Sequence, residues 1–112
     1  MRNSEIRLLI TLDDQQVPER IRWEADDSPA EGLQEAKAIS LAIWDGIEQG
    51  SLKIDLWNKD FEVREMKRFA IETMAGIADS IRRATSDEIM AMDISNLCDS
   101  LSKRLEQELK NS

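Results

Sequence analysis

The chain has 112 residues, which is enough for one domain that needs no disulfide or metal ion to be stable. It contains no histidine, no tyrosine and one cysteine, Cys98, so it lacks the usual general base and the commonest transition-metal ligand, and it cannot form an internal disulfide. Its 15 basic and 23 acidic residues give a net charge of −8, which argues against binding to nucleic acid or to an anionic membrane surface.

The apolar segments are all short. A membrane span needs about 20 consecutive apolar residues, whereas the apolar stretch nearest the N-terminus, Leu8–Ile10, is also too short for the core of a signal peptide. We therefore expect a cytoplasmic protein that does not insert into a membrane. A single thiol also suits a reducing compartment.

Alternating apolar residues predict four β-strands in the first half of the chain. In the first of them, Ile6, Leu8, Ile10 and Leu12 share one face. Turn and loop residues at 13–18, 25–32 and 45–50 separate the strands. The predicted strands are Glu5–Leu12, Arg20–Glu24, Lys37–Trp44 and Ser51–Trp57.

The third and fourth strands form the most strongly supported hairpin. Pairing Ile43 with Leu52 places Leu41 opposite Ile54 and Ile39 opposite Leu56, so one register matches six apolar residues. A helix over Glu31–Ile47 is the alternative, but apolar residues at 39, 41 and 43 have the spacing of a strand.

The second half of the chain changes to helical periodicity. Asp60 is the expected N-cap of a helix over about 61–83, and Thr85 with Glu88 has the pattern of a capping box that begins a second helix over about 86–109. Two apolar stripes are expected to be buried: Val63, Met66, Ala70, Met74, Ile77 and Ile81 on the first helix, and Met90, Ile94, Leu97, Leu101, Leu105 and Leu109 on the second.

The order of these elements predicts the fold class. Strands first and helices last indicate an α+β protein, here a four-stranded antiparallel sheet (ββββ) followed by two C-terminal helices packed on one face. We expect residues 1–112 to form a single domain.

The sheet face opposite the helices is the candidate partner interface. Large apolar residues enclosed by polar ones on a sheet surface are typical of protein interfaces. In the alternative, Trp44 and Trp57 fold over a sheet edge and are covered by the loop Ala25–Gly32. The open sheet edges offer another route to a partner, through strand addition or a homo-oligomer. The candidate residues are Leu9, Arg22, Ala42, Trp44, Asp55 and Trp57.

No pattern in the chain predicts catalysis, a cofactor or a metal site. Asp13 and Asp14 lie in one turn and Glu24, Asp26 and Asp27 near the next loop, without the ordered spacing of a calcium-binding loop. Cys98 lies on the apolar side of the second helix, where core packing is the expected role.

Several segments resemble the bacterial gliding motility protein GldC family. The most specific is LKIDLWNKD over Leu52–Asp60, and further matches are Leu12–Asp14, Val17–Glu19, Ile21–Trp23 and Glu65–Lys67. The resemblance extends over roughly residues 5–107. It implies a small soluble accessory protein associated with surface gliding, and it supplies no catalytic residue.

Two functions follow as hypotheses. The first is a non-enzymatic protein that binds a component of the gliding or secretion machinery. The second is a cytoplasmic chaperone or adaptor for secreted clients, because four antiparallel strands followed by two helices in an acidic chain are similar in order to the SecB export chaperone. An enzyme would have to use carboxylates, lysine or Cys98 alone, and we expect none.

Overall fold

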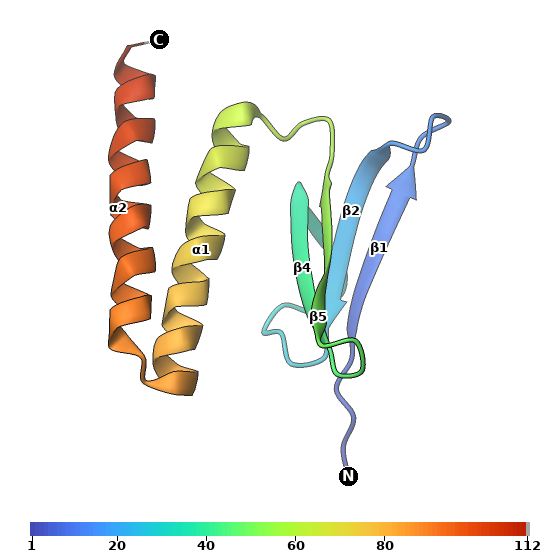
Figure 1. The fold of residues 1–112 in the computed structure, drawn as a ribbon. Helices are drawn as coiled ribbons and strands as arrows, with labels where there is room; N and C mark the ends of the chain where they lie inside the picture. The colour runs from blue at the N-terminus through green and yellow to red at the C-terminus, as the bar shows by residue number, and fades with distance from the viewer. Residues whose placement is uncertain (112) are drawn as a thin grey trace. The chain divides into compact units, whose positions relative to one another are not determined.

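A computed structural model of the protein describes residues 1–111, and Figure 1 shows the fold. The α+β class and the antiparallel strands are confirmed. The chain divides into two compact units, a β unit of residues 1–61 and a helical unit that begins at Glu62. The elements are β1 (Ile6–Leu12), β2 (Pro18–Ala25), β3 (Gln34–Ala36), β4 (Ala38–Asp45), β5 (Gly50–Trp57), α1 (Val63–Thr85) and α2 (Glu88–Lys110).

The β unit contains a three-stranded antiparallel sheet in the order β1-β2-β3. The central strand β2 places Ile21 opposite Ile10 of β1 and opposite Ala36 of β3. Ile21 is fully buried, and it is the one large side chain of the described residues that no solvent reaches. Ile10, on the even-numbered face of β1, therefore lies beside the buried Ile21 as the alternation predicts, but Ile6, Leu8 and Leu12 of the same face remain exposed.

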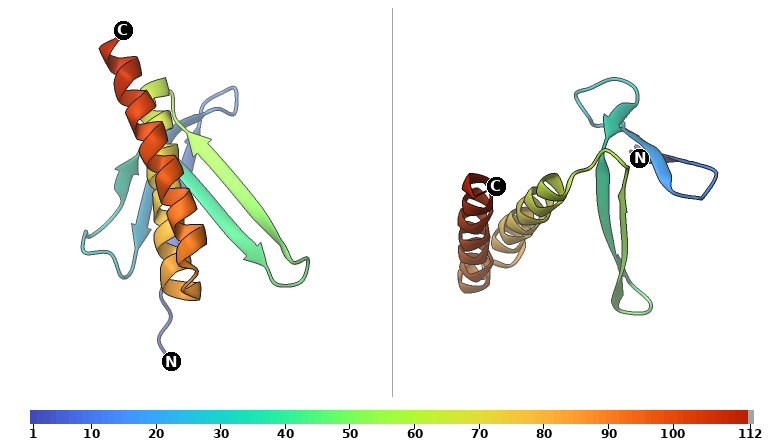
Figure 2. Two further views of the ribbon diagram at one scale, coloured as in Figure 1. Left: turned by 60° about the vertical axis from the view of Figure 1, so that its left-hand side comes forward. Right: turned by 90° about the horizontal axis from the view of Figure 1, so that it is seen from above.

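The second sheet is the β4–β5 hairpin. Its register confirms the predicted pairs, with Ile43 opposite Leu52 and Leu41 opposite Ile54. The turn is closed by main-chain hydrogen bonding of Gln49 to Asp45 at 2.9 Å, and Gln49 has a positive φ of 54°. Figure 2 shows this hairpin extending away from the β1–β2 ribbon.

The prediction of one four-stranded sheet is wrong. A fifth strand that was not predicted, β3, lies just before the predicted strand Lys37–Trp44. It pairs with β2, whereas β4, which corresponds to the predicted strand, pairs with β5. The Lys37 carbonyl accepts a hydrogen bond from the Asn58 amide at 2.9 Å, just beyond β5. Residues 34–45 thus change partner at Lys37, from β2 to β5, so the strands form two sheets instead of one. The three residues of β3 carry no large apolar side chain, so alternation could not reveal them.

The helical unit is an antiparallel pair of 23-residue helices. Both predicted caps are wrong by two residues: Glu62, not Asp60, is the N-cap of α1, and Asp87, not Thr85, is the N-cap of α2. The Asp87 carboxylate accepts a hydrogen bond from the Met90 amide at 3.0 Å. Thr85 is instead the last residue of α1, its hydroxyl donates to the carbonyl of Ile81 at 2.7 Å, and the helix ends at Ser86, which takes the left-handed conformation with φ of 61°.

Small side chains form the contact between the two helices. Ala78 of α1 and Ala91 and Cys98 of α2 are buried there, and the Cys98 thiol lies 3.6 Å from the Ile71 carbonyl. The packing expected of Cys98 is therefore confirmed. The expectation that both apolar stripes are buried is only partly met, since Val63, Ile77, Met90, Leu97 and Leu109 remain exposed. For Ile77, Met90 and Leu97 the reason is that the next residue along each helix, Ala78, Ala91 or Cys98, is the buried one.

Ion pairs join the helices at both ends. Lys67 pairs with Glu108 at 2.9 Å, and Arg82 pairs with Glu88 at 2.9 Å. Neither helix, within the part of the chain described, is long and apolar enough to cross a bilayer. The packing of the helices on one face of a sheet, and the single domain, stay predictions.

Candidate functional site

The six candidate interface residues lie in two different sheets. Leu9 of β1 and Arg22 of β2 are cross-strand neighbours in the three-stranded sheet. The others, namely Ala42, Trp44, Asp55 and Trp57, share one face of the β4–β5 hairpin. The candidate face predicted for one continuous sheet is therefore divided between two.

The surface around Leu9 and Arg22 is mainly ionic. Arg7 pairs with Glu24 at 3.1 Å and Arg20 with Glu35 at 2.5 Å. The hydrogen bond from Arg20 lowers the pKa of Glu35, and the charge of Arg22 lowers it further. The Nε atom of Arg22 is buried without a hydrogen-bond partner in the described structure, so this side chain acts through its charge and its packing. Ion pairs therefore surround Leu9 on this face.

The two tryptophans of the candidate face are exposed but far apart. Trp44 is 68% exposed and Trp57 is 51% exposed, so neither is covered by the loop Ala25–Gly32. Trp44 lies opposite Ser51 and Trp57 lies opposite Ala38. Because 38 and 44 are six residues apart along β4, the two indoles stand at opposite ends of the hairpin, separated by about 20 Å.

Asp55 is engaged on the hairpin face between these two ends. Lys53 donates to its carboxylate at 2.6 Å. This hydrogen bond, followed by one from Ser40, lowers the pKa of Asp55. Asp55 and Lys53 therefore form a polar centre on the face, and the apolar residues lie toward its ends.

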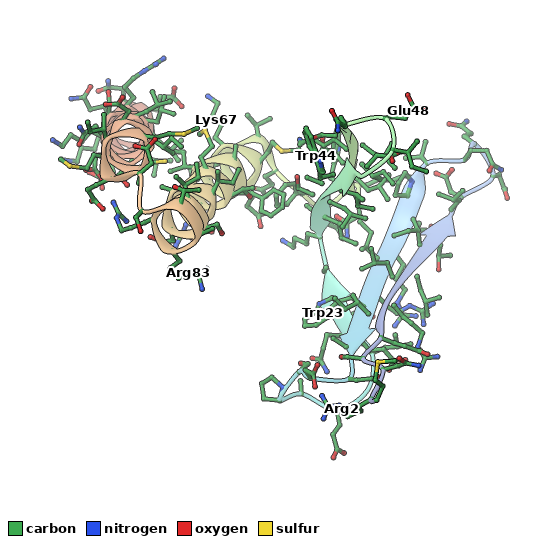
Figure 3. All side chains as sticks on the ribbon, turned by 60° about the horizontal axis from the view of Figure 1, so that its bottom comes forward. Arg2, Trp23, Trp44, Glu48, Lys67 and Arg83 are labelled. Carbon is green, nitrogen blue, oxygen red and sulfur yellow. The ribbon has the colours of Figure 1, made fainter. Side chains whose placement is uncertain are left out.

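The end of the hairpin that carries Trp44 exposes a further apolar residue, Ile47, that was not predicted. We define the hairpin tip as Trp44 and Ile47, which are both exposed; Ile43 and Leu52 are exposed at the same end but on the other face of the hairpin. Ile47 is the most exposed of them, at 90%. It lies in the turn, outside the alternating apolar pattern that predicts the strands. An isoleucine in a turn bounded by two glycines is the sequence feature that could have indicated an exposed apolar residue here. Figure 3 shows Trp44 and Glu48 near this turn and Trp23 elsewhere in the β unit.

The turn that carries the tip is held by its own hydrogen bonds. The Asp45 carboxylate accepts from the amide of Ile47 at 2.8 Å and from the amide of Glu48 at 3.3 Å. Local side-chain to main-chain bonds of this kind order a turn before any partner arrives. The tip therefore presents its apolar residues in a preorganised form, which lowers the entropy lost on binding.

The helical unit offers an apolar groove of its own. Its volume is about 260 Å³, and Ala70, Ile71, Met74, Leu101 and Leu105 contribute apolar walls beside the Lys67–Glu108 ion pair. Across residues 1–111 no three acidic or thiol side chains lie close enough together to hold a metal ion. The exposed apolar residues of the hairpin and the apolar groove of the helical unit are therefore the candidate binding surfaces.

Comparison with known proteins supplies a family. A family profile described as "Gliding motility-associated protein GldC-like" matches residues 18–107 of the 112 residues. The comparison with curated proteins gave no match, and neither did the comparison with solved structures.

Proposed function

The chain belongs to the GldC-like family of gliding motility-associated proteins, and from this premise we propose that it is a non-enzymatic accessory protein that binds another protein through the hairpin tip. The partner would be a component of the gliding or associated secretion machinery. The proposal assigns no reaction to the chain.

The exposure of Trp44, near the end of β4, and of Ile47, in the ordered turn that follows, is the observation that carries the proposal. A tryptophan side chain can bury up to about 250 Å². With 68% of Trp44 exposed, full burial would remove about 170 Å² from water, worth about 4 kcal/mol at about 25 cal/mol per Å². Interface residues of this kind typically lose about 2–4 kcal/mol of binding free energy on truncation to alanine.

The charges around the tip indicate the chemistry of its partner. The turn carries Asp45 and Glu48, and residues 43–52 contain no lysine or arginine. Complementary charge favours encounter and excludes wrong partners. A suitable partner therefore has an apolar pocket for the indole of Trp44, with lysine or arginine at its rim.

The test is affinity capture from the native cell followed by titration of the captured protein. We expect Trp44→Ala to weaken the binding of the purified partner by at least about 30-fold, which corresponds to about 2 kcal/mol. Ile47→Ser should weaken it as well. Raised salt should slow association without abolishing binding, because the rim charges are exposed.

Ile89→Ser is the matched control. Ile89 is also an exposed isoleucine, 77% accessible, but it lies in the first turn of α2. We expect this variant to bind as the wild type does, and Trp57→Ala to have a smaller effect than Trp44→Ala. Undiminished capture by a folded Trp44→Ala variant would refute the assignment of the tip.

A chaperone is the second candidate, and a specific observation favours it. The second face of the hairpin also exposes apolar residues, namely Ile43, Leu52 and Ile54. A broad apolar surface suits an unfolded client better than a single pocket does. The chain would then suppress aggregation of an unfolded protein at near-equimolar ratio. If the wild type does not suppress this aggregation, the chaperone function is refuted, and the proposal of a protein that binds through the hairpin tip is unaffected.

A further inference from the structure

Strand β1 is an open edge of the three-stranded sheet. It pairs with β2 on one side, and the described residues provide no strand for its other side. Figure 1 shows it at the outer edge of the sheet. Natural proteins usually protect such an edge with proline, central charges or a covering segment. The sequence of β1, IRLLITL, contains no proline and one charge, and that charge, Arg7, is paired with Glu24 at 3.1 Å.

The register determines which main-chain groups face the open side. The Asp26 amide donates to the Glu5 carbonyl at 3.0 Å, one step beyond the pair Ile6–Ala25. In an antiparallel ladder, alternate residues direct their main-chain groups toward the partner and away from it. The odd-numbered residues of β1 therefore bond to β2. The residues whose N–H and C=O groups point to the open edge are Ile6, Leu8 and Ile10.

We propose that this edge pairs with β1 of a second copy of the chain, antiparallel and with Leu9 on the twofold axis. A twofold interface must be complementary to itself. With Leu9 opposite Leu9, Leu8 lies opposite Ile10, and Ile6 lies opposite Leu12. The one charged residue, Arg7, lies opposite Thr11, so no like charges meet within the strand pair.

The hydrogen-bond pattern supports the same register. Leu8 and Ile10 both direct their main-chain groups outward, so each can exchange both hydrogen bonds with the other residue in the second copy. A shift by one residue would place outward-facing groups opposite inward-facing ones and would reverse the faces. The pairing joins two three-stranded sheets into one of six strands, a common size for a sheet. Ile6, which is 75% exposed, gains an apolar neighbour.

Disulfide cross-linking tests the register directly. Leu9 would form a non-hydrogen-bonded pair across the axis, with a Cα separation of about 4.5 Å, which a disulfide can span. We expect Leu9→Cys to give a covalent dimer under mild oxidation. Arg7→Cys should give none, because its two copies would lie four residues apart along the strands, at about 14 Å. The wild type, with its buried Cys98, is the control for unwanted bridging.

Edge substitutions test the pairing without new cysteines. Leu8→Pro removes an N–H that points away from β2, and proline is tolerated at such edge positions. We expect it to convert the dimer to a monomer in light scattering coupled to gel filtration. Leu8→Val keeps the N–H and should remain a dimer, and so should Trp44→Ala, which separates this inference from the proposed tip interface. Tryptophan emission would confirm that each variant is folded.

Two results would overturn the inference. The first is a wild type that is monomeric at tens of micromolar. The second is a dimer in which Leu9→Cys does not cross-link or Arg7→Cys does, because that dimer would use another surface or another register.

Discussion

Ile21 lies in the centre of the three-stranded sheet, and shortening it should destabilise the β unit in proportion to the carbon atoms removed. It is 0% exposed and stands between Ile10 and Ala36. Ile21→Val removes one carbon and Ile21→Ala removes three, each worth about 0.8 kcal/mol in transfer from water. With the added effect of the cavity, we expect the free energy of unfolding to fall by about 1 kcal/mol for valine and by about 3–4 kcal/mol for alanine.

Urea unfolding monitored by tryptophan emission measures this loss of stability in the β unit itself. All three tryptophans, Trp23, Trp44 and Trp57, belong to residues 1–61, so their emission reports on the unit that contains Ile21. Ile47→Ala is the control, because an isoleucine that is 90% exposed should change the free energy of unfolding by less than about 0.5 kcal/mol. A loss below about 1 kcal/mol for Ile21→Ala, or a loss equal to that of the control, would refute the assignment of Ile21 as the core of this sheet.

Three further predictions concern other parts of the chain. The hydrogen bond from Lys59 lowers the pKa of Asp13 from 3.8 to about 2; the stability this adds is present above pH 3.8 and is lost as the pH falls through about 2, so the urea midpoint of the wild type should fall more over that range than that of Asp13→Asn. Ala78 is fully buried between the helices, so Ala78→Leu should lower the free energy of unfolding by about 1–3 kcal/mol, as measured by far-ultraviolet circular dichroism. If Ala78→Leu and the exposed Ala84→Leu were equally stable, Ala78 would not lie in the contact between the helices. The Cys98 thiol is buried, so it should react with a thiol reagent slowly in the folded protein and rapidly in urea. Rapid labelling without denaturant would contradict the burial of Cys98 between the helices.

The family was recognisable before the structure was known. The segment Leu52–Asp60 and the shorter matches pointed to the GldC family, and the family profile confirms it over residues 18–107. The resemblance implies no residue role, so the candidate site rests on the pattern of side chains alone. Trp44 and Trp57 are both exposed, but they stand at opposite ends of the hairpin and so do not form the single apolar cluster that was expected.

Local pattern was reliable wherever neighbouring residues decide the outcome. The β4–β5 register followed from three apolar pairs, since a slip of one residue would reverse every side chain. Both helices were located to within about two residues at each end by their periodicity. Their caps were misassigned, because several acidic and hydroxyl side chains near each helix start can serve as a cap, and the path of the incoming chain decides among them.

The sequence by itself determined the order of strands and helices, the register of one hairpin, the acidic charge and the lack of histidine, all of which depend on residue identity or on contacts between near neighbours. Only the tertiary structure decided that a short strand before Lys37 pairs with β2, that small residues form the contact between the helices and that Trp44 and Ile47 are exposed at one end of the hairpin. These features depend on which segments, distant in the sequence, pair or pack together. The periodicity of a sequence indicates which face of a strand or helix is apolar, but not which other element that face packs against or which strand an edge pairs with.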